Sequence, residues 1–245
     1  RRTVIENAEE AVYEEKKLEE TEVCFLMDRF GYMRLIDKNA YERNKEAAHA
    51  ENKFIFTCMN TDKICIFTDM GRMHSIKVAD IPLVRFRDKG TPADNLSNYD
   101  SSQEQILYVA PVGHVKLATL LFVTKTSMCK LVAGAEFDVA KRTIASTKLG
   151  DEDQLIFVGP ADEMEQVVFQ SEGGYFLRFQ KQDISAMKKT SIGVRGMKLA
   201  EGDKLDHAYL LESRQEYTIT YHDKPYVLNR IKLSKRDSKG TKPRI

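Results

Sequence analysis

Lysine and arginine side chains recur along this sequence at positions that suit contact with a polyanion. A basic residue follows a predicted turn by three or four positions at Arg34, Lys130 and Arg178, and Lys77 lies slightly later in its unit. Any one of these charges alone is ordinary surface charge, but cations repeated once per unit would form a curved track. Phosphate contact requires charge rather than base readout, so the pattern predicts binding to a bent polyanion. Further candidates in the polar stretches between the predicted strands are Arg85, Arg87, Lys89, Arg142, Lys148, Lys188, Lys189, Arg195, Lys198, Lys235, Arg236 and Lys239.

Motifs for catalysis or metal binding are missing from the sequence. It contains no Walker A phrase, no G-x-S-x-G and no H-E-x-x-H, and its five histidines are scattered. The four cysteines form no C-x-x-C pair and sit in apolar runs, which predicts buried thiols in a reducing compartment. We therefore expect no catalytic residue, no metal site and no cofactor in this chain.

The charge is unevenly distributed. Thirty-eight basic residues face 37 acidic ones, a net charge of +1 that argues against a uniformly basic surface. Residues 1–22 carry eight Glu against four basic residues, whereas residues 224–245 carry eight basic residues against Asp237 alone. The near-zero total therefore conceals an acidic beginning and a basic end.

The elements that must position these cations follow a repeat. A short apolar strand, a turn and a second strand recur, and runs such as Ile64–Thr68, Leu120–Thr124 and Val167–Gln170 predict the first strands. At least three units add a Gly-rich basic loop, at Lys89–Thr91, Gly193–Gly196 and Lys239–Thr241. The turns fall at Gly31, Gly71, Ser127, Gly174 and about Asp223, and a large apolar residue follows each by ten positions, at Tyr41, Ile81, Phe137, Ile184 and Leu233.

This repeat predicts an all-β fold of about five four-stranded blades in a propeller-like array, with an irregular β-sandwich as the alternative. Residues 1–22 predict a short N-terminal helix, because Thr3 and Glu6 have capping-box spacing and apolar residues recur on one face. A solvated connecting helix is favoured over a partner-binding one. We expect a helical connector at 1–22, the β domain at 23–233 and a basic, fraying tail at 234–245.

Two phrases resemble a known family. Gly193-Val194-Arg195-Gly196-Met197-Lys198-Leu199-Ala200-Glu201-Gly202-Asp203 is similar to the phrase G-V-R-G-[IM]-[RK]-L-x-E-G-D in the C-terminal domain of the A subunit of bacterial type IIA DNA topoisomerases. The stretch from Asp69 to Val78, with Ile81-Pro82 and Lys89-Gly90-Thr91-Pro92 after it, resembles an early blade of the same family. The resemblance covers Val23 to Leu211 well and the last unit weakly.

The resemblance implies a β-pinwheel with strands exchanged between blades, whose basic outer rim binds and bends double-stranded DNA. The catalytic tyrosine, the magnesium site and the ATPase of such an ATP-dependent type II topoisomerase lie elsewhere, so the expected partners are the ATPase B subunit together with the rest of the A subunit. The chain begins with Arg and has neither a signal peptide nor a membrane-spanning run, so we expect a piece of a larger cytoplasmic, nucleoid-associated protein.

One departure from the family separates its two branches. Gyrase carries a basic box, Q-R-R-G-G-K-G, after the first aromatic landmark, whereas Tyr41 is followed here by Glu42-Arg43-Asn44-Lys45-Glu46. Only Arg43 and Lys45 keep the positive charge of the box, and the glycines that let the backbone approach phosphate are gone. This favours a topoisomerase IV type subunit. The alternatives are a gyrase subunit with a degenerate box and, from another class, a protein-interaction propeller.

Overall fold

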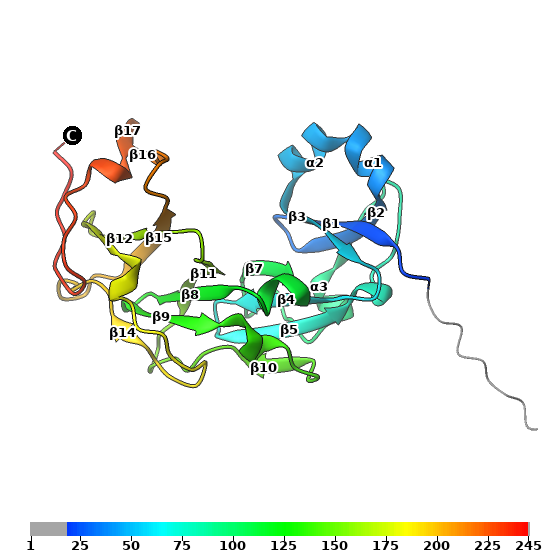
Figure 1. The fold of residues 1–245 in the computed structure, drawn as a ribbon, viewed down its shortest axis with the longest axis horizontal. Helices are drawn as coiled ribbons and strands as arrows, with labels where there is room; N and C mark the ends of the chain where they lie inside the picture. Colours follow the sequence, from blue (N-terminus) through cyan, green and yellow to red (C-terminus); the bar gives the residue numbers. More distant parts are fainter. Residues whose placement is uncertain (1–18, 245) are drawn as a thin grey trace, which may run out of the picture.

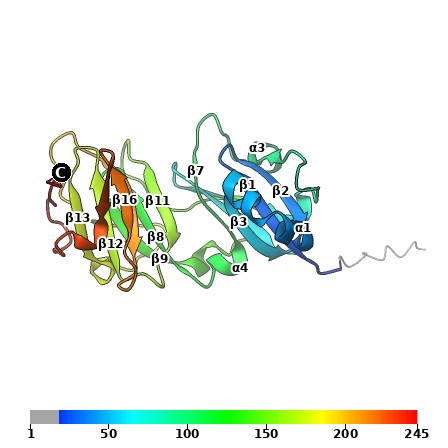
Figure 2. The same ribbon diagram turned by 90° about the horizontal axis from the view of Figure 1, so that it is seen from above.

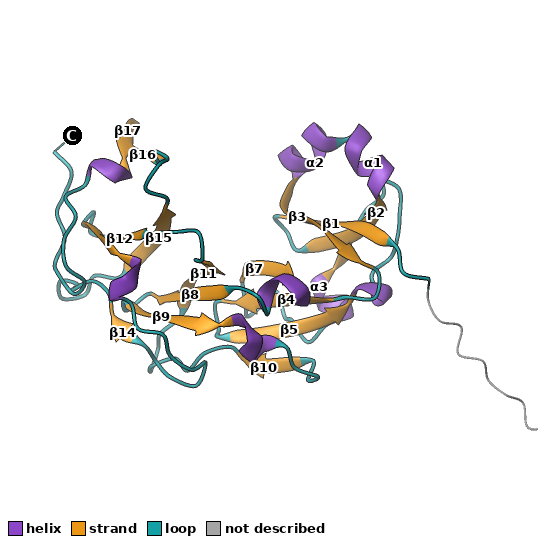
Figure 3. Cartoon of the chain, viewed as in Figure 1, coloured by secondary structure: helices purple, strands orange, loops and turns teal. Residues whose placement is uncertain are grey.

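The computed structural model describes residues 19–244, so most of the predicted N-terminal helix lies outside the described residues. Five antiparallel hairpins follow one another along the chain (Figures 1 and 3). All five predicted turns are confirmed, because Gly31, Gly71, Ser127, Gly174 and Asp223 each adopt the positive φ that a tight hairpin turn requires. The hairpins are β1 (Glu22–Asp28) with β2 (Tyr32–Asp37), β4 (Lys63–Thr68) with β5 (Arg72–Lys77), β8 (Thr119–Thr124) with β9 (Met128–Ala133), β12 (Gln166–Ser171) with β13 (Phe176–Gln180), and β16 (Thr218–Tyr221) with β17 (Lys224–Val227).

Each hairpin is the centre of one sheet, and the sheets are numbered 1 to 5 in chain order. The first strand of each of the first four hairpins pairs with a later strand of its own unit. These strands are β3 (Asn52–Met59), β7 (Ile106–Pro111), β11 (Leu155–Pro160) and β15 (Leu205–Leu211).

The second strand of each of the first four hairpins pairs with a segment donated by the following unit. Short strands β6 (Thr91–Pro92), β10 (Thr143–Ala145) and β14 (Val194–Arg195) cross back to complete sheets 1, 2 and 3. Thr241 makes the corresponding contact with Phe176 of sheet 4, through N–H to oxygen bonds of 2.8 and 2.9 Å. The donated segments, residues 78–92, 134–145, 181–195 and 228–241, are called the crossovers. They begin with the 3-10 helices η1 (Val78–Asp80), η2 (Gly134–Phe137), η3 (Lys181–Asp183) and η4 (Leu228–Arg230).

The predicted four strands per blade are found in three of the five sheets among residues 19–244. Sheet 4 has three strands plus the Thr241 bridge, and sheet 5 is the β16–β17 hairpin alone. In the first unit the place of a crossover is taken by α1 (Lys38–Arg43) and α2 (Lys45–Glu51). Two further short helices, α3 (Ala93–Leu96) and α4 (Val112–Val115), precede β7 and β8.

The sheets are arranged side by side along an open arc, with sheets 1 and 5 at its two ends (Figures 1 and 2). Strands β7 and β11 lie on the concave side of the arc, and β10 and β14 lie on the convex side (Figure 1). The β-sandwich alternative is wrong, because the sheets do not form two stacked layers. The crossovers consequently run along the convex edge.

Separate hydrophobic cores lie between neighbouring sheets. Leu120 and Phe122 face the core shared with sheet 2, whereas Leu121 and Val123 face the core shared with sheet 4. Because both faces of such a strand are buried, it is apolar at successive positions rather than at alternate ones. Aromatic edges contribute to the packing, with the Phe67 and Phe137 ring centroids 5.1 Å apart.

The apolar landmark after each turn has a structural role in three units. Ile81, Phe137 and Ile184 are at most 3% exposed and anchor the crossovers in the cores. Leu233, at the same position in the last unit, is 40% exposed, because Ile231 takes the buried place directly after η4. Tyr41 lies in α1 and has no crossover to anchor.

The Gly-rich loops allow each crossover to approach the preceding sheet closely. A Cβ atom at Gly90, Gly193 or Gly240 would lie 2.9, 2.6 or 2.6 Å from a carbonyl oxygen of the neighbouring strand. Gly193 also has a φ of +109°, which L side chains rarely adopt. The Gly-rich loops noted in the sequence therefore reflect strand exchange between sheets.

Gly193→Ala is expected to lower the free energy of unfolding by about 2–4 kcal/mol, since it combines a backbone clash with an unfavourable φ. Gly113→Ala is the matched control, because Gly113 lies in α4 and an added Cβ meets nothing within 4 Å. Urea unfolding followed by circular dichroism measures both variants. Equal midpoints for the two variants would show that the close approach of β14 to β9 contributes nothing.

Candidate nucleic-acid interface

Eleven of the sixteen predicted phosphate-binding residues are exposed, and they lie in or beside the crossovers of the convex edge. Each crossover reaches this edge because its 3-10 helix turns the chain outward before the donated strand pairs. The edge therefore carries cations contributed by successive units. The exposed residues are Lys77, Arg85, Arg87, Lys89, Arg142, Lys148, Lys188, Arg195, Lys198, Lys235 and Lys239.

Some of these exposed cations already have protein partners. Arg85 pairs with Asp88 at 3.2 Å, and Arg195 donates to Asp237 through Nη2 at 3.0 Å. The Arg195 hydrogen bond holds the pKa of the Asp237 carboxyl below its usual range. Arg142 donates through Nη2 to the Leu96 carbonyl at 3.2 Å. Exposed ion pairs of this kind are weak, so they reduce the charge presented to a ligand without preventing contact.

The prediction of a phosphate contact is wrong for Lys130. Its side chain is 1% exposed, and Nζ donates to the carbonyls of Lys188, Lys189 and Ser191 at 2.5–3.1 Å. Burial lowers the pKa of this lysine to about 8. Lys130 is therefore an internal tie between sheet 3 and its neighbouring crossover.

Arg178 likewise connects its own strand to a crossover by hydrogen bonds, between sheets 4 and 5. It is half-buried, and Nη1 donates to the carbonyls of Asn229 and Ile231 while Nε donates to Gln166 at 2.8 Å. Its guanidinium is engaged by the crossover at 228–241, so the structure does not leave it free for phosphate.

Three other predicted residues are also partly or wholly enclosed. Arg34 is 8% exposed, and its guanidinium lies over the Phe86 ring at 5.7 Å. Lys189 donates to the Glu136 carbonyl at 3.2 Å, and Arg236 donates through Nε to the Asp183 carbonyl at 2.8 Å. A direct phosphate contact is wrong for Arg34, because its side chain is covered.

Two crossovers that lie far apart in sequence run together between sheets 3 and 4. Lys198 N–H donates to the Ser238 carbonyl at 2.9 Å, and Asp237 N–H donates to the Gly196 carbonyl at 2.7 Å. Residues 234–241, which were expected to belong to a fraying tail, are thus hydrogen-bonded into the fold. The contact brings together the predicted cations Arg195, Lys198, Lys235, Arg236 and Lys239.

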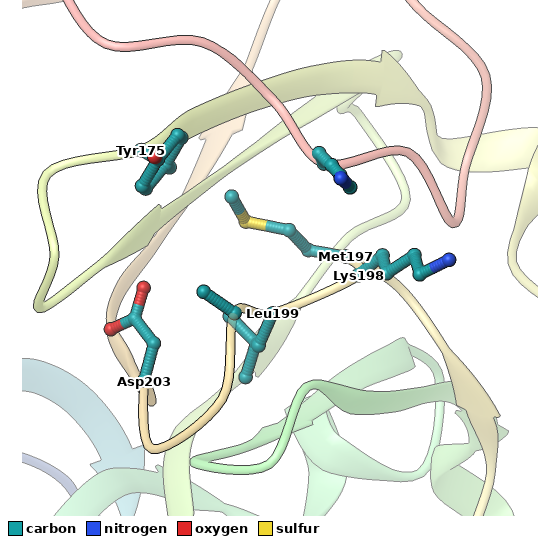
Figure 4. A pocket seen from close by; sticks show the side chains of 7 residues that line it. Tyr175, Met197, Lys198, Leu199 and Asp203 are labelled. Carbon is teal, nitrogen blue, oxygen red and sulfur yellow. The ribbon is translucent and has the colours of Figure 1, made fainter.

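A small pocket lies beside this contact. Figure 4 shows Tyr175, Met197, Leu199 and Asp203 around it, with the Lys198 ammonium directed away from Asp203. Its volume of about 130 Å³ and its carboxylate do not suit a phosphate. The Lys198 ammonium is thus presented at the outer surface, away from this pocket.

Two of the exposed cations that sequence reasoning left out lie close to predicted ones. Arg43 lies in the last turn of α1, and Lys242 lies over the Tyr175 ring at 4.9 Å. Arg43 was considered only as a remnant of the gyrase box, and the Lys242 contact depends on the folding back of residues 234–241.

Across residues 19–244, no three metal-ligating side chains cluster, and no helix has the length and apolar character needed to cross a membrane. The four cysteines are buried as predicted, and burial raises the pKa of the Cys129 thiol to about 12. Such a thiol is a poor nucleophile.

Comparison with known proteins decides the family. A family model described as DNA gyrase C-terminal domain, beta-propeller, matches residues 62–101, 118–162 and 165–212, which is more than half of the chain. The chain belongs to this family of C-terminal domains of DNA gyrase and topoisomerase IV A subunits. The resemblance carried by the 69–96 and 193–204 phrases is thereby confirmed.

Relatives from both branches are similar to this chain. The A subunit of DNA gyrase from Salmonella typhimurium is 30% identical over 217 residues, covering 84% of this chain and 25% of the relative. The A subunit of DNA topoisomerase 4 from Streptococcus pneumoniae is 27% identical over 174 residues, covering 68% of this chain and 21% of the relative. The chain thus spans about a quarter of the length of these relatives.

Solved structures of the family share the fold. The crystal structure of the C-terminal domain of DNA topoisomerase IV superposes with a TM-score of 0.81 at 22% identity, covering 92% of this chain and 73% of that one. The DNA gyrase A C-terminal domain superposes with a TM-score of 0.59 at 18% identity, covering 90% of this chain and 76% of that one. At these identities the likeness concerns the fold.

Proposed function

We propose that this domain binds duplex DNA along its convex edge and bends it around the arc. The observation that carries the proposal is the concentration of eleven predicted cations, all exposed, on or beside successive crossovers. Lys and Arg on flexible stems neutralise phosphates without reading bases. Because the edge is curved, a duplex that follows it must bend, and the summed contacts offset the cost of bending.

The domain acts as a binding and presenting module within a larger enzyme. DNA cleavage with its magnesium ions, like ATP hydrolysis, takes place in the ATPase B subunit or in the rest of the A subunit. The whole enzyme works in the cytoplasm, at the nucleoid. The convex edge then holds a DNA segment for passage through a break that is made elsewhere.

We further propose that the parent subunit is of the topoisomerase IV type. Residues 38–51, where gyrase carries its basic Gly-rich box, fold as α1 and α2 on sheet 1. This segment carries Glu42, Glu46 and Glu51 beside its few cations. A helical, mixed-charge segment offers little backbone for close approach to phosphate, and this supports relaxation and decatenation rather than supercoiling.

Salt-dependent binding tests the DNA proposal. Titration of the domain into a fluorescent duplex, read by anisotropy, should show an association constant that falls with salt, with a log–log slope of about −0.9 per phosphate contacted. A protein-interaction propeller would show no salt-sensitive binding to duplex, and that result would end the proposal.

Plasmid topology tests the subunit type. The full A subunit with its ATPase partner is expected to relax supercoiled plasmid and to decatenate linked circles, leaving relaxed plasmid unchanged. Introduction of negative supercoils into relaxed plasmid would assign the subunit to gyrase.

A further inference from the structure

We propose that the first crossover, residues 78–92, detaches from sheet 1 by local unfolding while the other crossovers stay attached to their sheets. The third crossover, residues 181–195, is the matched case, because its backbone is attached to sheet 3 in the same way while a buried donor also holds it. Detachment is a property of the domain alone and does not require DNA.

The two crossovers are attached by the same backbone contacts. In each, the chain forms a parallel bridge with the second strand of the hairpin, at Leu35 in sheet 1 and at Leu131 in sheet 3. The Val84 N–H donates to the Leu35 carbonyl at 2.9 Å, and the Met187 N–H donates to the Leu131 carbonyl at 2.8 Å. Val84 and Met187 therefore occupy equivalent places.

The same turn follows the bridge in both crossovers. The Asp88 N–H donates to the Arg85 carbonyl at 3.0 Å, and the Ser191 N–H donates to the Lys188 carbonyl at 3.1 Å. Counted from the bridge, the carbonyls of the first turn correspond one by one to those of the third. The corresponding pairs are Arg85 with Lys188, Phe86 with Lys189 and Asp88 with Ser191.

The buried side chain that meets each turn differs between the two sheets. Arg34 and Lys130 lie at the same level of their hairpins, since Leu26↔Arg34 and Phe122↔Lys130 are the second pairs from the hairpin turn. Lys130 donates through Nζ to three carbonyls of its crossover at 2.5–3.1 Å. Arg34 contacts its crossover through the Phe86 ring at 5.7 Å, and its Nε has no hydrogen-bond partner among residues 19–244.

The geometry of the two cations explains this difference. A lysine ammonium is compact and donates in three directions, so one Nζ can serve three converging carbonyls. An arginine guanidinium is planar and donates only within its plane, which suits stacking on an aromatic ring. The first crossover therefore lacks the shared donor that holds the third.

The remaining crossovers are also held by a side chain from the second strand of their own sheet. His74, which corresponds to Arg34 and Lys130, hydrogen-bonds through Nδ1 to the Thr143 hydroxyl of the second crossover at 2.9 Å. Arg178 donates to two carbonyls of the fourth crossover. Among the described crossovers, the first alone has no such hydrogen bond, so it should detach most readily.

Detachment has a consequence for the convex edge. Arg85, Arg87 and Lys89 all lie in the first crossover, so they move together when it detaches. This consequence rests on the proposed function: a duplex that contacts these cations in their attached positions binds the closed state better than the detached one. Added duplex should therefore hold the first crossover closed.

Amide hydrogen exchange in the intact domain, followed by NMR, measures detachment directly. After correction for intrinsic exchange rates, the Val84 amide should exchange about tenfold faster than the Met187 amide, because loss of a charge-assisted hydrogen bond favours opening by about that factor. Equal rates, or slower exchange at Val84, would overturn the proposal.

The variants Arg34→Lys and Lys130→Arg exchange the two buried cations. Lys130→Arg should speed exchange at Met187 about tenfold, and Arg34→Lys should slow exchange at Val84 by a similar factor. Lys53→Arg is the matched control, because Lys53 is exposed on β3 and should leave both amides unchanged. An unchanged Met187 amide in Lys130→Arg would show that the donor does not hold the crossover. Should that variant fail to fold, Arg34→Lys decides in the same way through Val84.

Added duplex separates this inference from the proposed function. In the complex, exchange at Val84 should slow about tenfold while exchange at Met187 stays the same. If duplex binds and Val84 exchanges as before, the closure by DNA is wrong. If no duplex binds, the proposed function fails, and the comparison of Val84 with Met187 in the free domain still decides whether the first crossover detaches.

Discussion

Replacing Lys188, Lys198 and Lys235 together by glutamine is expected to weaken duplex binding about a hundredfold near physiological salt. Each lysine is exposed at the convex edge, and each phosphate contact contributes about 0.9 to the salt slope. The slope should therefore fall by about three while the fold is retained, since these side chains are exposed. Anisotropy titrations at several salt concentrations measure both quantities.

The matched control removes three lysines that lie outside the crossover segments. Lys53, Lys116 and Lys204 are exposed on β3, after α4 and before β15, so their replacement changes the net charge equally. The control variant should lose only a few-fold in affinity, through the long-range field alone. Equal losses in the two variants would mean that the domain attracts DNA by net charge, without a binding edge.

Lys130→Met is expected to lower the free energy of unfolding by about 3 kcal/mol. The substitution leaves the carbonyls of Lys188, Lys189 and Ser191 without their shared donor. Duplex affinity of the folded domain should change less than twofold, because Lys130 is 1% exposed. Lys77→Met is the control, as Lys77 is exposed and should barely alter stability. A large loss of DNA affinity without loss of stability in Lys130→Met would restore Lys130 as a phosphate contact.

Stability should also depend on pH through this lysine. Burial lowers the pKa of Lys130 from the ordinary 10.5 to about 8 in the folded chain. Between these values the unfolded chain binds more protons than the folded one, so the lysine's contribution to stability rises with pH in that window. The stability difference between wild type and Lys130→Met should therefore grow from pH 8 to 10. A difference that shrinks over this range would contradict the direction of the shift.

Hairpins were the most predictable part of the fold. Their turns require positive φ at single residues such as Gly31, Gly71 and Gly174, and their first strands are apolar because both faces are buried. Strand exchange was less visible, since β6 and β14 have only two residues each and carry no periodicity. Its trace in the sequence was the close-approach glycine, which was interpreted as part of a basic loop.

Charge alone was a poor guide to the interface. Arg34 and Lys130 carry the same charge as Lys188, yet they lie inside apolar strands such as Cys129-Lys130-Leu131-Val132 and are buried with them. A cation flanked by buried apolar residues on both sides is better interpreted as a buried hydrogen-bond donor that connects neighbouring segments of the fold. Arg43 shows the opposite case, because its exposed position depends on α1, which no repeat landmark predicts.

Protection of lysines from chemical modification tests the central claim most directly. The domain is acetylated with a limiting reagent, with and without duplex, and each lysine is quantified by mass spectrometry. If DNA binds along the convex edge, Lys188, Lys198, Lys235 and Lys239 become protected while Lys53, Lys116 and Lys204 keep their reactivity. Protection of the second group, with unchanged reactivity in the first, would contradict this account of where the DNA lies.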